Sequence, residues 1–422
     1  MAHQRGVAGP LLKGTTDMQF ASHNNAASER KKVLPLFIMI DAAGWEILRN
    51  RPFLSAVAPH RRRLETVFGY SSACVPSIVS GRWPDEHRHW CYFVNAPESS
   101  PFRSLSWLRW LPSSLTGRRF VRRMLTKFVK RKLGFRGYFD LYNVPFEHIH
   151  RFDFTEKKSP LVAGGMNDGE NIFDQLERAS VPYFVNDPTR PEDESQDALL
   201  AHVAAAEIDF AFVYWAGLDG LLHSVGNQSP RIDEKLAVYD RWITDVVAKA
   251  REHYDEVQLF VFSDHGMANC DELLDIQAVL AETALKFGRD YTAVFDSTMA
   301  RFWFHTSDAR VIVENALAGV KEGRILSNEE LLRLRAPTDG AWGELMFLVR
   351  EGVLICPSHM GERPIRAMHG YHPDDPQSAA TLLTNVPSIP TDITAIPHIH
   401  RLMHECALRA HFNNTTKHQT AH

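Results

Sequence analysis

Apolar runs that alternate with helical segments are the feature that most constrains the fold of this chain. Each run is an almost uninterrupted stretch of apolar residues, as in a strand buried on both faces of a parallel sheet. The runs span residues 33–40, 181–185, 208–215 and 257–262, and the predicted helices between them span residues 171–179, 192–206 and 231–252. This order predicts an α/β fold: a doubly wound, mostly parallel sheet sandwiched by helices, which binds ligands at the carboxyl ends of its strands.

Two segments interrupt this alternation. Residues 91–160 are rich in proline and contain a strongly basic helix, and residues 285–362 contain short alternating runs with one or two helices. We expect both to be insertions into one catalytic domain at residues 32–408, the first a basic helical insertion and the second a small α+β cap. The flanking residues 1–31 are polar and lack periodicity, so we expect them to be disordered. Residues 409–422 are expected to form a polar tail.

The composition excludes several classes of protein. Of the 422 residues, 44% are hydrophobic and 23% are charged, which is the balance of an ordinary globular protein rather than of a disordered or fibrous one. No apolar run reaches the ~18 to 20 residues that a membrane-spanning helix needs. The formal net charge of −4 argues against nucleic-acid binding by the chain as a whole.

The cysteines indicate that the protein resides in a reducing cellular compartment. All five are scattered along the chain without Cys-x-x-Cys spacing, which is typical of reduced thiols rather than of a disulfide framework. Lys31 and Lys32 before residues 33–40 have the outline of a secretory signal. However, this run begins more than thirty residues into the chain and ends at Asp41 instead of at a small-residue cleavage site. We therefore interpret the run as a buried strand and expect a cytoplasmic protein.

Carboxylates and histidines recur at or near the predicted strand ends. Each one alone has an ordinary structural explanation, such as a helix cap, a turn or a surface ion pair. Together they follow the order Asp, Asp-x-x-x-His, Asp-His and His. Imidazole and carboxylate ligands suit zinc, or manganese where oxygen ligands dominate, and six ligands are enough for two divalent ions. The six candidate metal ligands are Asp41, Asp219, His223, Asp264, His265 and His369.

A hydroxyl-rich segment follows the first of these carboxylates. Residues 70–81 read Tyr-Ser-Ser-Ala-Cys-Val-Pro-Ser-Ile-Val-Ser-Gly, and Pro84 and His87 come soon after. In this segment and in the order of its ligands the chain resembles the alkaline phosphatase superfamily, and most closely its type I phosphodiesterase/nucleotide pyrophosphatase branch. In that branch a nucleophilic Thr or Ser stands ten residues before a Gly, and counting back from Gly81 gives Ser71.

The resemblance covers roughly residues 33–90 and 165–400. It implies an alkaline-phosphatase-like core, two divalent metal ions and a nucleophilic Ser71 that forms a covalent phosphoseryl-type intermediate. One ion would be held by Asp219, His223 and His369, and the other by Asp41, Ser71, Asp264 and His265.

The segment departs from the family pattern at two points. The nucleophile is Ser where phosphodiesterases usually have Thr, and the Asn expected a few residues on is missing from the neighbourhood of Ser72, Ala73 and Cys74. A Ser followed by small residues also resembles alkaline phosphatase itself, so the choice between monoesters and diesters stays open. Ser72 is the alternative nucleophile if the register is shifted by one residue. His372, three residues past His369, is either unrelated to the site or a hydrogen-bond donor to one of its ligands.

The leading hypothesis is therefore a metal-dependent phosphohydrolase that cleaves phosphodiester or nucleotide-pyrophosphate bonds. Its substrate would be a small phosphorylated molecule, either nucleotide-like or a lipid or sugar phosphodiester. A phosphomonoesterase or a phosphotransferase of the same superfamily is the alternative among enzymes. A metal-binding pseudoenzyme is the non-enzymatic alternative, and the competent residue types at all ligand positions argue against it. The sequence leaves the oligomeric state open.

A basic segment lies within the first insertion. Residues 101–136 contain eleven Lys and Arg residues and no Asp or Glu. Seven apolar residues at helical spacing form a stripe, and basic residues cover most of the remaining positions of residues 118–133. We interpret this segment either as a cap helix with a solvated charged face, or as a helix that contacts an anionic membrane or admits polyanionic substrates. The stripe consists of Phe120, Val121, Met124, Leu125, Phe128, Val129 and Leu133.

Overall fold

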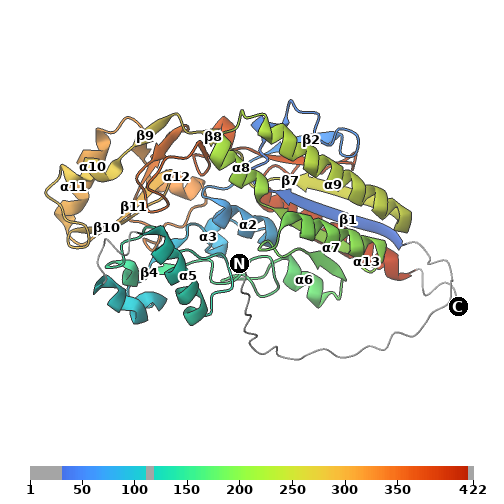
Figure 1. The fold of residues 1–422 in the computed structure, drawn as a ribbon, viewed down its shortest axis with the longest axis horizontal. Helices are drawn as coiled ribbons and strands as arrows, with labels where there is room; N and C mark the ends of the chain where they lie inside the picture. Colours follow the sequence, from blue (N-terminus) through green and yellow to red (C-terminus); the bar gives the residue numbers. More distant parts are fainter. Residues whose placement is uncertain (1–30, 111–117, 417–422) are drawn as a thin grey trace, which may run out of the picture.

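A six-stranded sheet forms the centre of the computed structural model, which describes residues 31–110 and 118–416 (Figure 1). In spatial order its strands are β2 (His60–Leu64), β16 (Ala380–Thr384), β7 (Tyr254–Phe262), β1 (Lys31–Ile40), β6 (Phe210–Trp215) and β5 (Tyr183–Val185). β1 pairs in parallel with β6 and β7, and β5 pairs in parallel with β6. β16 runs antiparallel to both of its neighbours. The sheet is therefore mostly parallel, as predicted.

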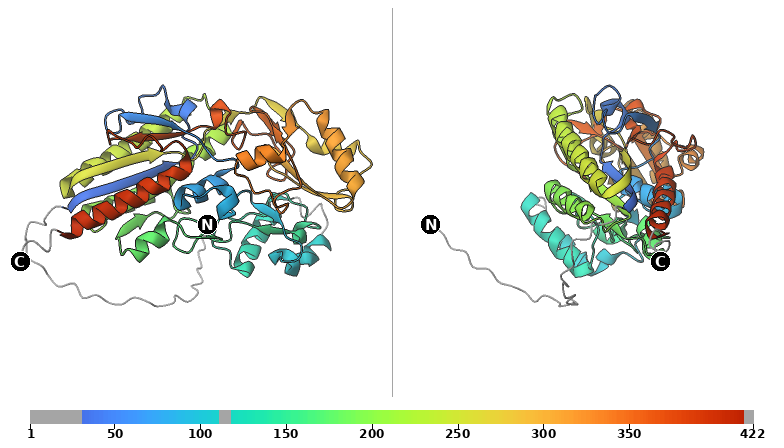
Figure 2. Two further views of the ribbon diagram at one scale, coloured as in Figure 1. Left: turned by 180° about the vertical axis from the view of Figure 1, so that it is seen from behind. Right: turned by 90° about the vertical axis from the view of Figure 1, so that its right-hand side faces the viewer.

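Helices cover both faces of this sheet (Figure 2). On β1, Leu34, Leu36 and Ile38 pack into one hydrophobic cluster, and Phe37 and Met39 pack into another on the opposite face. All five side chains are fully buried, which explains why the strand is a continuous apolar run. No helix in the described ranges is long and apolar enough to cross a membrane. The first cluster is covered by α1 (Trp45–Leu48), α7 (Glu192–Ala204), α8 (Gly217–Val225) and α9 (Arg231–His253), and the second by α2 (Ser71–Ser80), α6 (Ile172–Arg178) and α13 (Ile399–Thr416).

The C-terminal prediction was wrong for residues 409–416, which form the last turns of α13 instead of a polar tail. This part of the helix is held by a buried polar side chain. Oδ1 of Asn414 accepts hydrogen bonds from the N–H groups of Lys32 and Val33, at 2.8 and 3.1 Å. A satisfied polar residue does not show in a hydrophobic pattern, so the sequence read as a tail. Lys31 already belongs to β1, and the predictions for residues 1–30 and 417–422 lie outside the described residues.

Residues 91–160 pack around an aromatic core. Phe139 lies edge-on to Phe154 with ring centroids 4.8 Å apart, and Phe102 stacks on Phe139 at 6.0 Å. Val294 and Trp303 of the second sheet described below join the same cluster, which fixes the insertion to the rest of the molecule. Its elements are β3 (Phe93–Asn95), η1 (Pro101–Trp110), α5 (Arg119–Leu133), η2 (Ile149–Arg151) and β4 (Phe152–Phe154), and α3 (Pro84–His87) precedes them. β3 and β4 pair antiparallel.

A second, antiparallel sheet lies at one end of the central sheet (Figure 1). Its strands are, in spatial order, β10 (Tyr291–Phe295), β11 (Met299–Phe304), β13 (Leu345–Val349) and β12 (Gly323–Ile325). Three helices accompany it, α10 (Ile276–Ala281), α11 (Ser307–Ala318) and α12 (Asn328–Arg333).

The chain enters and leaves this second sheet through two short strand pairs. β8 (Ala268–Asn269) and β9 (Glu272–Leu274) lead out from β7, and β14 (Val353–Ile355) and β15 (Ala367–Met368) lead back. β9 pairs with β14, and β8 pairs with β15. The short helices η3 (Pro376–Ser378) and η4 (Ile396–His398) flank β16. The pairing returns the chain to the carboxyl end of β7, although about a hundred residues separate the two segments in sequence.

Candidate active site

Seven candidate residues converge at one edge of the central sheet. Three parallel strands supply five of them just beyond their carboxyl ends, where open α/β sheets gather ligands. Ser71 is the first residue of α2, and His369 directly follows β15. The five are Asp41 after β1, Asp219 and His223 in α8 after β6, and Asp264 and His265 after β7.

Asp41, Asp264 and His265 form the first group of potential metal ligands. Their three ligand atoms lie within 4.8 Å of one another. Nε2 of His265 is 3.4 Å from Oδ1 of Asp41 and 3.2 Å from Oδ2 of Asp264. The hydroxyl oxygen of Ser71 is 3.0 Å from the same nitrogen. The structure therefore brings together all four residues that the family resemblance assigns to one ion.

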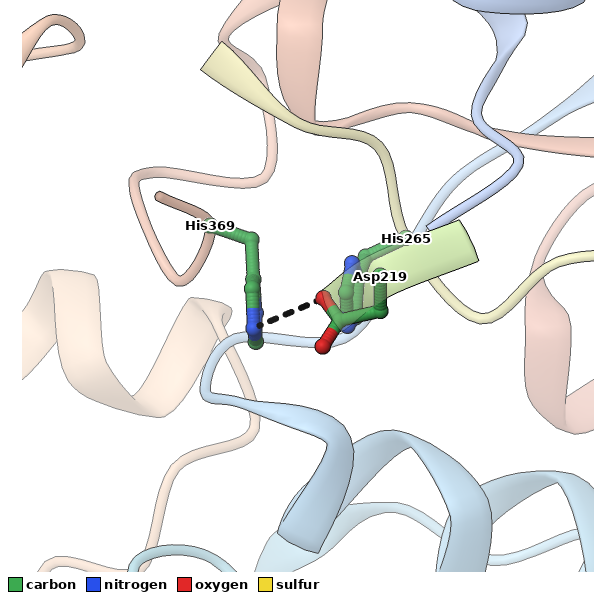
Figure 3. A group of neighbouring side chains, drawn as sticks. All are labelled: Asp219, His265 and His369. Carbon is green, nitrogen blue, oxygen red and sulfur yellow. Dashed lines mark ion pairs between the residues drawn. The ribbon is translucent and has the colours of Figure 1, made fainter. Parts of the chain in front are cut away.

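Asp219, His265 and His369 form a second group, again with ligand atoms within 4.8 Å of one another (Figure 3). Nε2 of His369 lies 3.7 Å from Oδ1 of Asp219, and the rings of His265 and His369 stack with centroids 3.8 Å apart. His223 joins through the same carboxylate, with Nε2 3.3 Å from Oδ1 of Asp219. The two groups share His265, so the six predicted metal ligands form one continuous cluster.

Backbone carbonyls orient two of the three imidazoles. Nδ1 of His223 lies 2.8 Å from the carbonyl oxygen of Ala367, and Nδ1 of His265 lies 2.9 Å from that of Gly266. Because a carbonyl oxygen only accepts hydrogen bonds, each neutral ring carries its hydrogen on Nδ1 and presents the lone pair of Nε2 to the cluster. Metal-ligating histidines are held in this way.

Each carboxylate of the cluster has one buried oxygen without a hydrogen-bond partner among the described residues: Oδ1 of Asp41, Oδ1 of Asp219 and Oδ2 of Asp264. The other oxygen of Asp264 accepts hydrogen bonds from the N–H groups of Ala42 and His265, at 3.2 and 3.0 Å. A buried carboxylate oxygen without a partner is costly, and a bound cation would satisfy it. The donor set of carboxylate oxygens and imidazole nitrogens fits a divalent ion such as zinc or manganese.

Burial and charge control the protonation of these carboxylates. Burial raises the pKa of Asp41 well above its usual value, and the charges of Asp264 and Asp219 raise it further. Burial also raises the pKa of Asp264 to about 7. At Asp219 burial again disfavours the ionised form, but once His223 is protonated its Nε2–H pairs with this carboxylate, and this pairing together with the charges of His223, His369 and His265 outweighs burial and lowers the pKa to about 2. Without a cation, the charge of the ionised Asp219 therefore adds to burial in disfavouring ionisation of Asp41 and Asp264.

The two neighbouring serines differ in their surroundings. Ser71 is partly exposed and its hydroxyl faces His265, whereas Ser72 is buried and donates a hydrogen bond to the carbonyl of Trp90 at 2.9 Å. Ser71 also lies at the N-terminus of α2, where the N–H groups of the first helical turn and the helix dipole favour negatively charged oxygens. The geometry thus favours Ser71 over the alternative Ser72 as the nucleophile.

Two side chains that the sequence did not single out hold parts of the cluster. Tyr214 donates a hydrogen bond to Oδ2 of Asp41, and Glu192 accepts one from the N–H of Gly217 at 2.7 Å, at the start of α8. Tyr214 lies in an apolar run whose pattern indicates only a buried strand. A hydroxyl group within that apolar run is the only feature of the sequence that indicates a polar role for Tyr214.

A third contact joins the second sheet to the cluster. The hydroxyl of Thr298 donates a hydrogen bond to the carbonyl of Gly370 at 2.8 Å, directly beside His369. The hydroxyl of Tyr70 lies 2.8 Å from the same Thr298 oxygen, and because Thr298 has given its one hydrogen to Gly370, Tyr70 is the donor. No sequence pattern links these residues, since they come from three distant segments.

Two residues considered from the sequence lie apart from the cluster. Nε2 of His372 is 3.3 Å from Oε1 of Glu330 in α12, so His372 faces the second sheet's helix rather than a metal ligand. Cys74, in the neighbourhood where the family resemblance leads one to expect an Asn, is buried with its sulfur 3.5 Å from the hydroxyl of Thr66. Within the described residues, no hydrogen bond or ion pair joins either residue to the seven candidates.

Comparisons with known proteins identify the family and the fold. Residues 136–372 match the family model described as type I phosphodiesterase/nucleotide pyrophosphatase. Among solved structures, the murine ectonucleotide pyrophosphatase/phosphodiesterase 5 superposes with a TM-score of 0.63 at 14% identity, over 90% of this chain and 95% of that chain. An inactive variant of the murine protein in complex with AMP gives 0.61 at 14% identity, and the human protein gives 0.60 at 13%, both over the same shares of each chain. At these identities the likeness shows the fold. No curated protein sequence matches the chain significantly.

Proposed function

The chain belongs to the type I phosphodiesterase/nucleotide pyrophosphatase family, whose members are hydrolases of phosphoester or pyrophosphate bonds, and we propose that it cleaves such bonds through a covalent intermediate on Ser71. One observation carries this proposal. The Ser71 hydroxyl lies 3.0 Å from Nε2 of His265, at the edge of a cluster that combines three carboxylates with three imidazoles. The matched residues 136–372 include five of the seven candidates, and the fold adds Asp41 and Ser71.

Two divalent metal ions, zinc or manganese, are the proposed cofactors. The unpaired oxygens of the three carboxylates and the inward-facing imidazole nitrogens support this part of the proposal. Bound ions would lower the pKa of the Ser71 hydroxyl and offset the charge of the phosphoryl oxygens. The proposed ligands are Asp219, His223 and His369 for one ion, and Asp41, Ser71, Asp264 and His265 for the other.

The proposed reaction has two steps. In the first step the hydroxyl proton of Ser71 passes to solvent and Oγ attacks the phosphorus atom. A new ester bond to Ser71 forms, and the bond to the leaving oxygen breaks, with its electron pair staying on that oxygen. Water then hydrolyses the seryl ester and restores the hydroxyl of Ser71. The N-terminus of α2 faces the phosphoryl oxygens in both steps and stabilises the negative charge that they carry.

A nucleotide is the proposed substrate class, since a structurally similar protein has been solved in complex with AMP. A cluster of three tyrosines in the insertion offers such a ligand one exposed ring, that of Tyr138, which is 54% exposed. The ring of Tyr92 stacks on that of Tyr142 with centroids 5.4 Å apart, and Tyr138 lies beside Tyr92 at 5.6 Å. Burial raises the pKa of Tyr138, and the charge of Asp219 contributes to this shift, which is consistent with a position on the side of the cluster. Aromatic faces of this kind stack on bases or sugars.

A cytoplasmic location is also proposed. The five cysteines are all free in the structure, and Cys74 and Cys91 are buried. Free thiols are usual in a reducing compartment. Fractionation of cells that express the full chain, followed by detection of the protein in each fraction, tests this location.

A paired assay tests the function. The purified full chain is incubated with zinc or manganese and either bis-p-nitrophenyl phosphate, a diester, or p-nitrophenyl phosphate, a monoester. We expect metal-dependent hydrolysis with a higher kcat/KM for the diester. Hydrolysis of the monoester alone would make the chain a phosphomonoesterase, and transfer of the phosphoryl group to an added alcohol in preference to water would make it a phosphotransferase. Absence of turnover on both esters and on a dinucleoside pyrophosphate would contradict the proposal.

A further inference from the structure

The helix α5 buries only one side of its apolar stripe and leaves the other side exposed to solvent. Val129 is fully buried in the aromatic cluster of the insertion, and Leu125 and Leu133 pack against that cluster. Phe120 and Met124, from the same stripe, are 74% and 53% exposed. The apolar stripe is wide enough to cover two sides of the helix. Only one of these sides packs against the rest of the insertion.

Polar contacts fix which side of the helix is buried. The guanidinium of Arg122 lies over the ring of Phe146 at 4.6 Å and donates a hydrogen bond to the carbonyl of Val144 at 3.1 Å. Thr126 donates to the carboxylate of Asp140 at 2.8 Å, and Lys130 donates to the carbonyl of Gly137 at 2.8 Å. These three residues lie on the docked side together with Val129. The orientation of the helix therefore rests on several independent contacts.

The opposite side, here called the outward face, consists of two parallel rows at helical spacing. An i, i+4, i+8 row is apolar, and a second i, i+4, i+8 row beside it is basic. All six side chains are exposed. Within the described residues, no member of the basic row forms an ion pair with a carboxylate. The apolar row is Phe120, Met124 and Phe128, and the basic row is Arg123, Lys127 and Arg131.

The residues around α5 are also rich in exposed hydrophobic side chains and in basic residues. Six of the thirteen exposed large hydrophobic residues in the described ranges lie between residues 107 and 138, among them Trp107 and Trp110 of η1. Residues 101–136 contain no acidic residue, although the chain as a whole has a formal net charge of −4. Exposed hydrophobic residues and unopposed positive charge are therefore concentrated on one insertion, which lies outside the layers of the central sheet (Figures 1 and 2).

We propose that the outward face of α5 docks the enzyme on an anionic lipid bilayer. A bilayer surface offers hydrocarbon to the apolar row and phosphate groups to the basic row at the same time, which is how interfacial helices bind. A nucleic acid would pair with the basic row alone and leave Phe120, Met124 and Phe128 in water. A second copy of the chain would bring two basic rows together. Only a negatively charged lipid surface complements both rows.

Vesicle sedimentation tests this surface with the full chain. We expect the protein to pellet with vesicles of phosphatidylcholine and phosphatidylglycerol, to bind vesicles of phosphatidylcholine alone much more weakly, and to be released by added NaCl. Reversing the basic row in the triple variant R123E/K127E/R131E should weaken partitioning by about a hundredfold or more. That loss corresponds to about 1 kcal/mol for each basic residue near the surface.

Two further variants separate lipid docking from other effects. The triple variant F120S/M124S/F128S should also lose vesicle binding, while its Tm and its turnover of a soluble nitrophenyl ester stay unchanged, because these side chains face away from the core. The matched control R63E/K249E/K321E changes the net charge equally on β2, on α9 and after α11, and it should bind vesicles like the unmodified chain.

Several results would overturn the proposal. These are equal binding by the basic-row variant and the unmodified chain, salt-resistant binding to phosphatidylcholine alone, or a large fall in Tm for the serine variant. Binding of a single-stranded DNA oligonucleotide without binding to the anionic vesicles would assign the outward face to nucleic acid. Concentration-dependent dimerisation without lipid, abolished in the serine variant, would assign it to a second copy.

Discussion

Oγ of Ser71 and Nε2 of His265 lie 3.0 Å apart although 194 residues separate them in the sequence. The contact exists because α2 begins, and β7 ends, at the same edge of the central sheet. Since Nδ1 of His265 is bound to the carbonyl of Gly266, the nitrogen that meets Ser71 carries a lone pair. The Ser71 hydroxyl therefore sits beside a nitrogen suited to a metal ion or a proton.

The first prediction concerns the nucleophile. Ser71→Ala should lower kcat for a diester by roughly a thousandfold or more, because it removes the attacking oxygen. Metal content should stay close to that of the unmodified chain, since six ligand side chains remain. Steady-state kinetics and elemental analysis of the same preparation measure both quantities.

Ser72→Ala is the matched control for that variant. It removes the hydrogen bond to the carbonyl of Trp90 and should mainly lower the Tm, with a loss of stability of roughly 1 kcal/mol. Reversed phenotypes would identify Ser72 as the nucleophile. Activity retained in both variants would point to direct attack by water without a covalent intermediate.

The second prediction concerns metal removal. A chelator should lower the Tm of the protein, because the buried carboxylates of Asp41, Asp219 and Asp264 then face one another without a cation. In the chelated state Asp264→Asn should raise the Tm, since its amide oxygen can still accept from the N–H groups of Ala42 and His265 while one charge is lost. With zinc added, the order should reverse. Thermal melts with chelator and with zinc measure both effects, and the same order in both conditions would argue against a metal site.

The local part of the site could be predicted from the sequence, and the part that depends on packing could not. Asp264 and His265 follow an apolar run after a single residue, Ser263. Asp219 and His223 have i, i+4 spacing, so short-range patterns place all four. Tyr214 reads as one more residue of a buried strand, and its role depends on the neighbouring strand that carries Asp41. Tertiary packing also decided that Ser71 rather than Ser72 faces the cluster.

The fold, like the site, could be predicted from the sequence only where the pattern is local. The parallel strands were predicted because burial on both faces leaves a continuous apolar signature. The last turns of α13 were missed because Asn414, their central buried contact, is polar and satisfied by β1. In α5 the periodicity predicted one apolar stripe, but the sequence alone does not say which part of that stripe the insertion covers.

The third prediction concerns Gly370, which follows His369 and accepts the hydrogen bond from Thr298. Gly370 has a φ of +89°, and a Cβ atom there would lie 2.4 Å from a ring carbon of Tyr70. Gly370→Ala should therefore shift His369 and weaken zinc binding by about tenfold or more, as changes behind a metal ligand commonly do. Zinc titration of the metal-free protein measures the affinity.

Gly340→Ala is the matched control, because Gly340 has a similar φ of +78° but no heavy atom within 4 Å of the position that a Cβ atom would take. This variant should show a comparable backbone penalty in its Tm and an unchanged affinity for zinc. Equal zinc affinity in both variants would mean that the loop of Gly370 does not position His369.

The last prediction concerns Glu156, a buried acid of the insertion. Burial raises the pKa of its carboxyl from 4.5 to about 8, so the folded protein keeps a proton that the unfolded chain has already released. Below pH 4.5 both states are protonated and the residue has no effect. Between pH 4.5 and about 8 the free energy of unfolding should fall as the pH rises, by roughly 1.4 kcal/mol per pH unit from this residue. Above about pH 8 this residue no longer makes the free energy of unfolding depend on pH, and the full loss of stability that it causes remains.

Glu156→Gln should remove this contribution. The variant should match the unmodified chain in acid and become progressively more stable than it toward pH 8, because all other titrating groups are common to both proteins. Urea unfolding across this pH range measures the difference in the free energy of unfolding. Glu98→Gln, at an exposed position of the same insertion, is the control: its free energy of unfolding should change with pH as that of the unmodified chain does. Parallel curves for Glu156→Gln as well would show that its carboxyl ionises in the folded protein much as it does in the unfolded chain, and that solvent reaches it.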